Sequence, residues 1–294
     1  MESFLVSALK YRPTSFDEVV GQDSITKTLG NSLKTNQLPQ ALLFCGPRGV
    51  GKTSCARILA KQINANNSNT SKDFAFNIFE LDAASNNSVE DIRKINEQVR
   101  IPPQIGSHKI YIIDEAHMLS NAAFNAFLKT LEEPPKYVIF ILATTEPHKV
   151  APTIRSRTQH YEFELLPGDE LAKHIRWVAE DAELTVTDEM IEYVLRIGGG
   201  SARDTLSALE QVVTAGGIPN DDDSLGNILR GIAHSDSSLV VNGLSQAIQS
   251  GRDPRIIGES LIDRLRDGFL FALNAPTGHF SDRQRELAQE LAEM

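Results

Sequence analysis

The stretch at residues 44–64, FCGPRGVGKTSCARILAKQIN, constrains the fold of this chain more than any other. It contains the pattern G-x-x-x-x-G-K-[ST], with Gly46, Gly51, Lys52 and Thr53 at the fixed positions. The apolar run ALLF, at residues 41–44, comes before this pattern, and a stretch with helical periodicity follows the pattern. This is the strand, loop and helix context of a phosphate-binding P-loop. The alternative is a glycine-rich turn without a ligand, and the correct flanking elements disfavour it.

The P-loop pattern gives its residues distinct roles. Glycines let the backbone wrap tightly around a phosphate, so that N–H groups and the start of the following helix face the anion. Lys52 is expected to reach the β- and γ-phosphates of ATP, and the Thr53 hydroxyl to hold Mg²⁺. The residues expected to contact the nucleotide through this loop are Gly46, Pro47, Arg48, Gly49, Val50, Gly51, Lys52, Thr53 and Ser54.

A second apolar run, KIYIIDE at residues 109–115, ends in two carboxylates. Near-continuous apolar runs are typical of parallel strands covered on both faces, and ligands bind at the carboxyl ends of such strands. Asp114 is therefore expected to hold Mg²⁺ alongside Thr53, and Glu115 to polarise the attacking water. A solvated turn is the alternative for two adjacent acids, but the strand and the P-loop before them favour a Walker B site.

Strands alternate with helices up to about residue 166, which predicts an α/β doubly wound domain with a parallel sheet. After Pro167 the strand pattern disappears and amphipathic helical patterns follow. We therefore expect a nucleotide-binding α/β domain at 1–166, a helical domain at 167–217 and a third, helical domain at 218–294. Ser88, with Asp91 three residues later, and Ser120 are expected to begin helices.

Composition and charge exclude other classes of protein. A net charge of −10 argues against a protein that coats nucleic acid over its whole surface. No run approaches ~18 apolar residues and the N-terminus does not resemble a secretory signal, so no membrane association is expected. The two cysteines, Cys45 and Cys55, have no zinc-ligand spacing and indicate a reduced, cytoplasmic compartment.

Several further positions have two interpretations each. Thr144, at the end of the next apolar strand, could bond the γ-phosphate or be ordinary β-branched strand sequence. Arg157 and Arg203 could each be a solvated surface charge or a phosphate contact, which Arg157 would make across a subunit boundary. Val19 and Val20 could pack on the sheet or form a wall of an adenine pocket.

Short motifs spread over residues 6–208 resemble, in their order along the chain, the gamma/tau family of bacterial DNA polymerase III. Members of that family are the AAA+ ATPases of the sliding-clamp loader. The motifs are YRP at 11–13, VVGQ at 19–22, the P-loop at 46–53, LDAAS at 81–85, DEAH at 114–117, LKTLEEPP at 128–135, ATTEP at 143–147, SRT at 156–158 and GSARD at 200–204.

The resemblance implies roles that the residues alone leave open. Thr144 is similar to sensor 1, Arg157 to the finger that acts on the ATP of a neighbouring subunit, and Arg203 to sensor 2. The helical domains would be the lid and an incomplete collar. The resemblance also implies two sets of contact residues: Tyr11, Arg12, Val19 and Val20 for the adenine-side pocket, and Arg93 and Arg100 for a helix that faces DNA.

The function implied is that of the ATPase motor subunit of a clamp loader. Its partners would be the other loader subunits in a ring of five, the sliding clamp and primer-template DNA. The family usually carries a four-cysteine zinc module before LDAAS; residues 65–73 contain no cysteine, so ATP and Mg²⁺ are expected but no zinc.

Three other functions share part of this pattern. A non-motor loader subunit of the delta-prime kind would have a degraded P-loop, which the intact Lys52 and Glu115 disfavour. A branch-migration AAA+ helicase would end in a winged-helix domain, and the C-terminal stretch has no β-hairpin pattern. A DEAH-type helicase would need a second motor domain, which the helical pattern after residue 166 does not offer.

Overall fold

The computed structural model describes residues 7–65, 75–218, 224–249 and 253–273, together with 285, 288–289 and 291–292. The chain divides into two compact units, Met1–Val186 with Tyr193–Gln211 and Thr187–Glu192 with Val212–Met294. The division into three domains at residues 166 and 217 stays a prediction. Apart from Ala65, the segment at 65–73 in which no zinc module is expected lies outside the described residues.

The first unit contains a sheet of five parallel strands in the order β2-β3-β4-β1-β5. In that register Cys45, the last residue of β1, lies beside Thr144, the last residue of β4. The carboxyl ends of β1, β3 and β4 therefore meet at one edge of the sheet, and the predicted α/β fold with a parallel sheet is confirmed. The strands are β1 (Ala41–Cys45), β2 (Ile78–Asp82), β3 (Lys109–Asp114), β4 (Val138–Thr144) and β5 (Gln159–Glu162).

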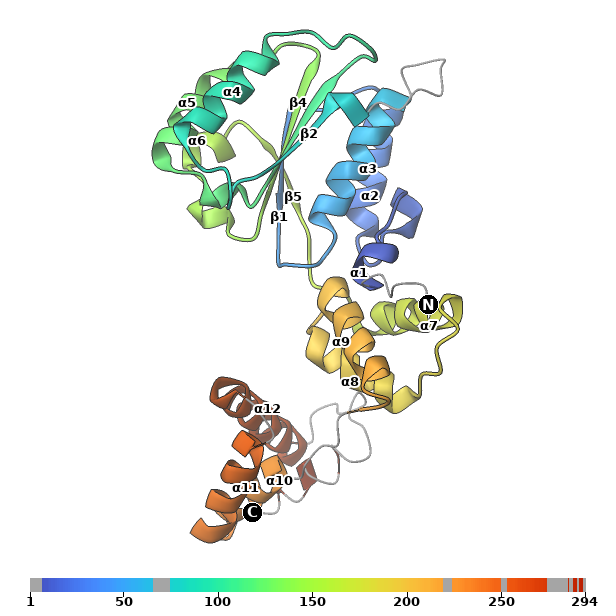
Figure 1. Ribbon diagram of the computed structural model, residues 1–294, viewed down its shortest axis with the longest axis vertical. Coiled ribbons are helices and arrows are strands. Elements are labelled where there is room, and N and C mark those ends of the chain that lie inside the picture. The colour runs from blue at the N-terminus through green and yellow to red at the C-terminus, as the bar shows by residue number, and fades with distance from the viewer. Residues whose placement is uncertain are drawn as a thin grey trace. The chain divides into compact units, whose positions relative to one another are not determined.

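Helices cover both faces of the sheet, as Figure 1 shows. Alternate residues of each strand enter opposite cores: Leu42 packs with α2 and α3, whereas Leu43 packs with α4, α5 and α6. Because both faces are buried, β1, β3 and β4 read as continuous apolar runs. The covering helices are α2 (Asp23–Lys34), α3 (Lys52–Ala65), α4 (Val89–Val99), α5 (Asn121–Glu132) and α6 (Pro152–Arg155).

Two predicted helix starts are confirmed. Ser88 forms a capping box with Asp91: its hydroxyl accepts from the Asp91 N–H, and the Asp91 carboxylate accepts from the Ser88 N–H. Ser120 likewise accepts from the N–H of Ala123 at the start of α5. These caps satisfy N–H groups that have no partner within their helices, and they fix where each helix begins after its loop.

One strand of the sheet has no counterpart in the sequence prediction. In β5 only Tyr161 is buried, while Gln159, His160 and Glu162 are exposed. An edge strand with one buried side chain carries neither an apolar run nor a clear alternation. The short elements of this unit are α1 (Ser7–Lys10), η1 (Phe16–Glu18), η2 (Ala75–Asn77), η3 (Ala116–Met118) and η4 (Pro147–Lys149).

The helical patterns after Pro167 are confirmed as α7 (Gly168–Asp181), α8 (Asp188–Gly198) and α9 (Ala202–Thr214). Leu171, Ile175 and Val178 form the buried face of α7. Their spacing of three and four residues places them on one side of the helix, as the pattern predicts.

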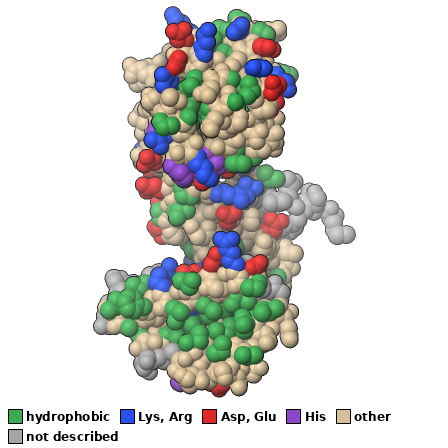
Figure 2. All heavy atoms as spheres, turned by 90° about the vertical axis from the view of Figure 1, so that its left-hand side faces the viewer, with side chains coloured by type: hydrophobic (Ala, Val, Ile, Leu, Met, Phe, Trp, Pro, Cys, Tyr) green, Lys and Arg blue, Asp and Glu red, His purple; other side chains and the backbone are tan. Residues whose placement is uncertain are grey.

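The second unit contains, among its described residues, the complete helices α10 (Ser224–Ala233), α11 (Ser237–Gln249) and α12 (Pro254–Ala272). Leu225, Ile228, Ala247 and Ile257 make its core. The same helices expose many apolar side chains, and Figure 2 shows a broad field of them over this unit. They include Val241, Leu244, Ile248, Ile262, Leu265 and Phe269. Within the described ranges, no helix has the length and apolarity needed to cross a membrane.

Candidate nucleotide-binding site

The P-loop connects the end of β1 to the start of α3 at the carboxyl edge of the sheet. Gly46 and Gly49 adopt φ values of +142° and +73°, in the region that favours glycine. At Gly46 a Cβ would lie 2.2 Å from the carbonyl oxygen of Phe163, so no larger residue fits there without a shift of the backbone. The loop therefore takes a tight path directly above the sheet, with the N-terminus of α3 behind it.

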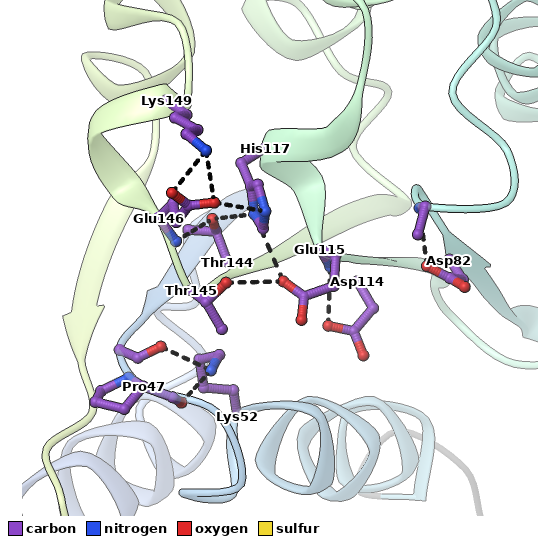
Figure 3. Close-up of polar contacts among 12 residues, drawn as sticks. Pro47, Lys52, Asp82, Asp114, Glu115, His117, Thr144, Thr145, Glu146 and Lys149 are labelled. Atoms are coloured by element: carbon purple, nitrogen blue, oxygen red, sulfur yellow. Dashed lines mark hydrogen bonds and ion pairs between the residues drawn. The ribbon is translucent and has the colours of Figure 1, made fainter. Parts of the chain in front are cut away.

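Lys52 begins α3 and turns back into the loop, as Figure 3 shows. Its Nζ donates to the carbonyl oxygens of Gly46 at 2.8 Å and Pro47 at 2.5 Å, and the residue is 6% exposed. Burial lowers the pKa of Lys52, while the nearby carboxylates of Glu115 and Asp114 act in the opposite direction. The loop thus encloses the ammonium group of Lys52, which bonds two backbone carbonyls and is influenced by two nearby carboxylates.

The two predicted metal ligands lie together. The Thr53 hydroxyl donates to Asp114 Oδ2 at 2.8 Å, and Asp114 Oδ1 accepts from the N–H of Glu115 at 2.9 Å. A hydroxyl and a carboxylate are the oxygen ligands that Mg²⁺ takes, with water and phosphate completing its shell. The donor set therefore fits the expected ion.

Glu115 follows β3 in a left-handed conformation, with φ +48°. Such a backbone is strained for a residue with a side chain, and it directs the carboxylate away from the strand axis. Its Oε2 accepts from the Thr145 hydroxyl at 3.2 Å. The side chain is 36% exposed, which leaves it accessible to a water molecule.

The two threonines at the end of β4 have different surroundings. Thr144 is fully buried; its Oγ1 accepts from the N–H of Glu146 at 3.0 Å and lies 3.0 Å from Nδ1 of His117. Thr145 instead bonds Glu115. The contact of Thr144 with a γ-phosphate stays a prediction, and Thr145 is a candidate that the sequence pattern did not distinguish. A pair of adjacent threonines gives no signal as to which one faces the site.

Arg203, in the first turn of α9, lies next to the P-loop. Its backbone N–H donates to the carbonyl oxygen of Gly49 at 3.4 Å. Ser201, which is 5% exposed, accepts from the N–H of Asp204 and begins the same helix. The start of α9 thus contacts the loop directly through its backbone, and a contact of the Arg203 side chain with phosphate stays a prediction.

This contact leads to a prediction for Gly49→Ala. The added Cβ would lie 2.0 Å from Ser201 Oγ in a left-handed backbone, so we expect the free energy of unfolding to fall by about 1–3 kcal/mol. Gly30→Ala is the matched control: Gly30 lies inside α2 with nothing within 4 Å, and its replacement should raise stability by about 0.5–1 kcal/mol. Urea denaturation measures both, and a Gly49→Ala variant as stable as the wild type would contradict the close approach.

The N-terminal residues predicted for the adenine side have different surroundings. Val19 is 8% exposed, belongs to the same core cluster as Val50 of the P-loop, and has its Cγ1 4.0 Å from where a Cβ on Gly51 would lie. Tyr11 instead donates its hydroxyl to Asp181 Oδ2 at 2.9 Å and meets the Trp177 ring edge-on, both residues of α7. The two remaining predicted residues, Arg12 and Val20, are half-buried in the same segment.

Arg157 lies between α6 and β5 and has a partner in its own chain. Its guanidinium contacts Glu132 Oε1 at 2.7 Å and donates to the carbonyl oxygen of Thr153 at 2.8 Å. With 37% of its side chain exposed, it remains accessible to another molecule. Its contacts within the described residues do not include the P-loop, so the two are not brought together within one chain. The arginines predicted to face DNA, Arg93 and Arg100, are both exposed on or at the end of α4.

Both cysteines are buried beside the P-loop as free thiols. Burial raises the pKa of the Cys55 thiol to about 12 and also raises the pKa of Cys45. They therefore pack as small apolar groups. In the described part of the chain, no three His, Cys, Asp or Glu side chains are grouped as a metal site would require.

The sequence matches a family described as DNA polymerase III, delta subunit, over residues 21–167, which is 147 of 294 residues. The gamma/tau subunit of DNA polymerase III from Mycobacterium tuberculosis is 38% identical over 286 residues, 88% of this chain and 50% of the relative. The tau subunit from Bacillus subtilis is 38% identical over 286 residues, 89% and 51% of the two chains. The chain thus spans about half the length of these curated relatives.

Solved structures share the architecture. The Thermotoga maritima RuvB Holliday junction branch migration motor superposes with a TM-score of 0.56 at 20% identity, covering 76% of this chain and 79% of that one. At this identity the likeness extends to the fold alone, and it confirms the predicted α/β domain with a parallel sheet, followed by helices. The closer sequence relatives are DNA polymerase III subunits.

Proposed function

Because the chain belongs to the DNA polymerase III gamma/tau family, we propose that it is the ATPase motor subunit of a bacterial clamp loader. The observation that carries the motor role is the contact of Thr53 with Asp114 beside the enclosed Lys52, with Glu115 next in the chain. Together these residues supply an anion site, a metal site and a base. A subunit that only filled a place in a ring would need none of the three.

In this proposal each residue acts on bound ATP. Lys52 leaves the Gly46 and Pro47 carbonyls and donates to the β- and γ-phosphates, supported by the N-terminus of α3. Thr53 and Asp114 would hold Mg²⁺, which would supply positive charge against the phosphates. Glu115 takes a proton from the attacking water, and the Thr145 hydroxyl fixes the direction of its carboxylate.

Partners complete the proposed cycle. The chain joins other loader subunits in a ring of five, where Arg157 reaches the ATP of a neighbour and Arg203 reports the phosphate to the lid. The exposed apolar face of α11 and α12 supports assembly, because an apolar face of this kind is typical of an interaction site. ATP binding then opens the sliding clamp around primer-template DNA, and hydrolysis releases both. The cytoplasm is the proposed compartment.

The family description as a delta subunit favours one other function, that of a loader subunit without a motor. The two functions differ in whether the chain itself binds and hydrolyses ATP. If assembled rings hydrolyse no more ATP with this chain than without it, the non-motor role holds.

The experiment that tests the shared site uses Arg157→Ala in the assembled ring. We expect ATP hydrolysis to fall by about 10³-fold or more, since an arginine supplied to a γ-phosphate contributes on that scale. The affinity of the chain for ATP should not change, because Arg157 does not contact the P-loop of its own chain. Arg255→Ala, which removes an arginine at the start of α12, is the control and should hydrolyse ATP normally. An Arg157→Ala ring at full activity would contradict the shared site.

A further inference from the structure

One side chain beside the site has no role in the reaction described so far. His117 belongs to η3, two residues after Glu115, and its side chain is 7% exposed. Figure 3 shows its ring among Glu115, which follows β3, and Thr144 and Glu146 at the end of β4. Nδ1 lies 3.0 Å from Thr144 Oγ1 and 3.5 Å from Glu115 Oε2, and Nε2 lies 3.2 Å from Glu146 Oε2.

The ring of His117 links two polar groups at the end of β4. Thr144 Oγ1 accepts from the N–H of Glu146, and the residue is fully buried. Nδ1 of His117 shares a hydrogen bond with this hydroxyl. Nε2 donates to Glu146, because an ionised carboxylate can only accept.

Glu146 is held in place by further charges. Lys149 Nζ lies 2.7 Å from its Oε1 and 3.0 Å from its Oε2, and His148 Nε2 lies 3.7 Å from Oε1. Lys149 is the main reason that the pKa of the Glu146 carboxyl is lowered. Glu146 is therefore an anionic acceptor for His117. The chain of contacts runs from Glu146 through His117 to Thr144.

We propose that His117 is a positioning residue for ATP hydrolysis, an inference that rests on the proposed function. Its ring joins the turn that carries Glu115 to the end of β4 that carries Thr145. This tie keeps the Thr145 hydroxyl 3.2 Å from the Glu115 carboxylate, so that the base points in one direction. The shortest contacts of His117 are with Thr144 and Glu146, and its Nδ1 lies 3.5 Å from the Glu115 carboxylate, so it acts on the attacking water through Glu115.

His117→Leu and His117→Gln separate this role from simple packing. Leucine fills the space without a donor or an acceptor, whereas the glutamine amide carries both and can bond Thr144 and Glu146. In single-turnover hydrolysis by the full chain assembled with the other loader subunits, His117→Leu should lower the rate by about 10²-fold, the effect of a misplaced catalytic group. The affinity for ATP should stay within about threefold, since the anion site is not altered. His117→Gln should recover most of the rate.

His148→Leu is the matched control, because His148 is 71% exposed and approaches the same carboxylate without joining it to Glu115. It should hydrolyse ATP at the wild-type rate. Should His117→Leu fail to fold, Glu146→Leu removes the same contact from its other end and should show the same loss. If His117→Leu and Glu146→Leu act through one contact, the variant with both substitutions should lose no more of the hydrolysis rate than either single variant.

A His117→Leu or Glu146→Leu ring that hydrolyses ATP within about threefold of the wild type overturns the role of His117. A loss shared equally by His148→Leu overturns it as well. A wild-type chain that binds no ATP would instead overturn the proposed function, and the role of His117 with it. The two failures are therefore distinguishable in the same set of measurements.

Discussion

Replacing Lys52 by alanine is expected to raise the dissociation constant for ATP by at least about 10²-fold, which is about 2.7 kcal/mol. Lys52 is the cation enclosed by the P-loop, and no other lysine or arginine of the described residues has a side-chain contact with the Gly46 or Pro47 carbonyl. A buried charge that meets a phosphate contributes on the scale of 2–5 kcal/mol when it is removed. Isothermal titration with ATP and Mg²⁺ measures the change.

The same variant should not unfold more easily than the wild type. Burial lowers the pKa of Lys52, so the folded chain already holds this charge at a free-energy cost that alanine removes. Lys61→Ala is the control: Lys61 lies on α3 too, but it is exposed, and its replacement should leave ATP affinity unchanged. A Lys52→Ala chain that binds ATP as tightly as the wild type would contradict the site.

Glu115→Gln is expected to lower the rate of ATP hydrolysis by about 10²–10⁴-fold while ATP binding is retained. Glutamine keeps the size of the side chain, and its carbonyl can still accept from Thr145, but it cannot take the proton of the attacking water. The variant should therefore hold ATP without turning it over. Rapid mixing with radiolabelled ATP in the assembled ring separates the two steps.

Glu133→Gln is the control for the loss of one carboxylate, since Glu133 is exposed at the end of α5. Its ring should hydrolyse ATP at the wild-type rate. If Glu115→Gln hydrolyses ATP as fast as this control, Glu115 is not the base. Asp114 would then be the next carboxylate to test, because it lies beside Thr53.

The fold could be predicted from the sequence where local patterns and burial agree. The strands β1, β3 and β4 are nearly continuous apolar runs because helices cover both of their faces, and the P-loop pattern requires a strand before it and a helix after it. The caps at Ser88 and Ser120 are similarly local signals. Each of these predictions depends on residues close together in the chain.

Other features depend on contacts that sequence spacing does not encode. The strand β5 lies at the sheet edge with one buried residue, so its composition is that of a loop. Nothing in the sequence indicates that Tyr11 would bond Asp181 of α7, or that Arg157 would pair with Glu132. The sequence also does not show that Thr144 contacts His117 whereas Thr145 contacts Glu115, which is the difference between the two threonines in the structure.

The DEAH segment illustrates both cases. Its acids follow an apolar strand, which is enough to predict a Walker B site from sequence. Its histidine belongs to no periodic apolar pattern and lies far from Glu146 in the sequence. The contact between His117 and Glu146 is therefore seen only in the structure, where β3 and β4 lie side by side.

The most direct test of the central proposal is ATP hydrolysis by the chain mixed with the other clamp-loader subunits. The rate of this mixture is measured under four conditions: without additions, with primed DNA, with the sliding clamp, and with both DNA and clamp. We expect the largest stimulation when both are present, with Lys52→Ala chains showing none, because ATP use is proposed to serve the loading of the clamp on DNA. A rate that is indifferent to clamp and DNA together, from an assembled ring that binds ATP, would contradict it.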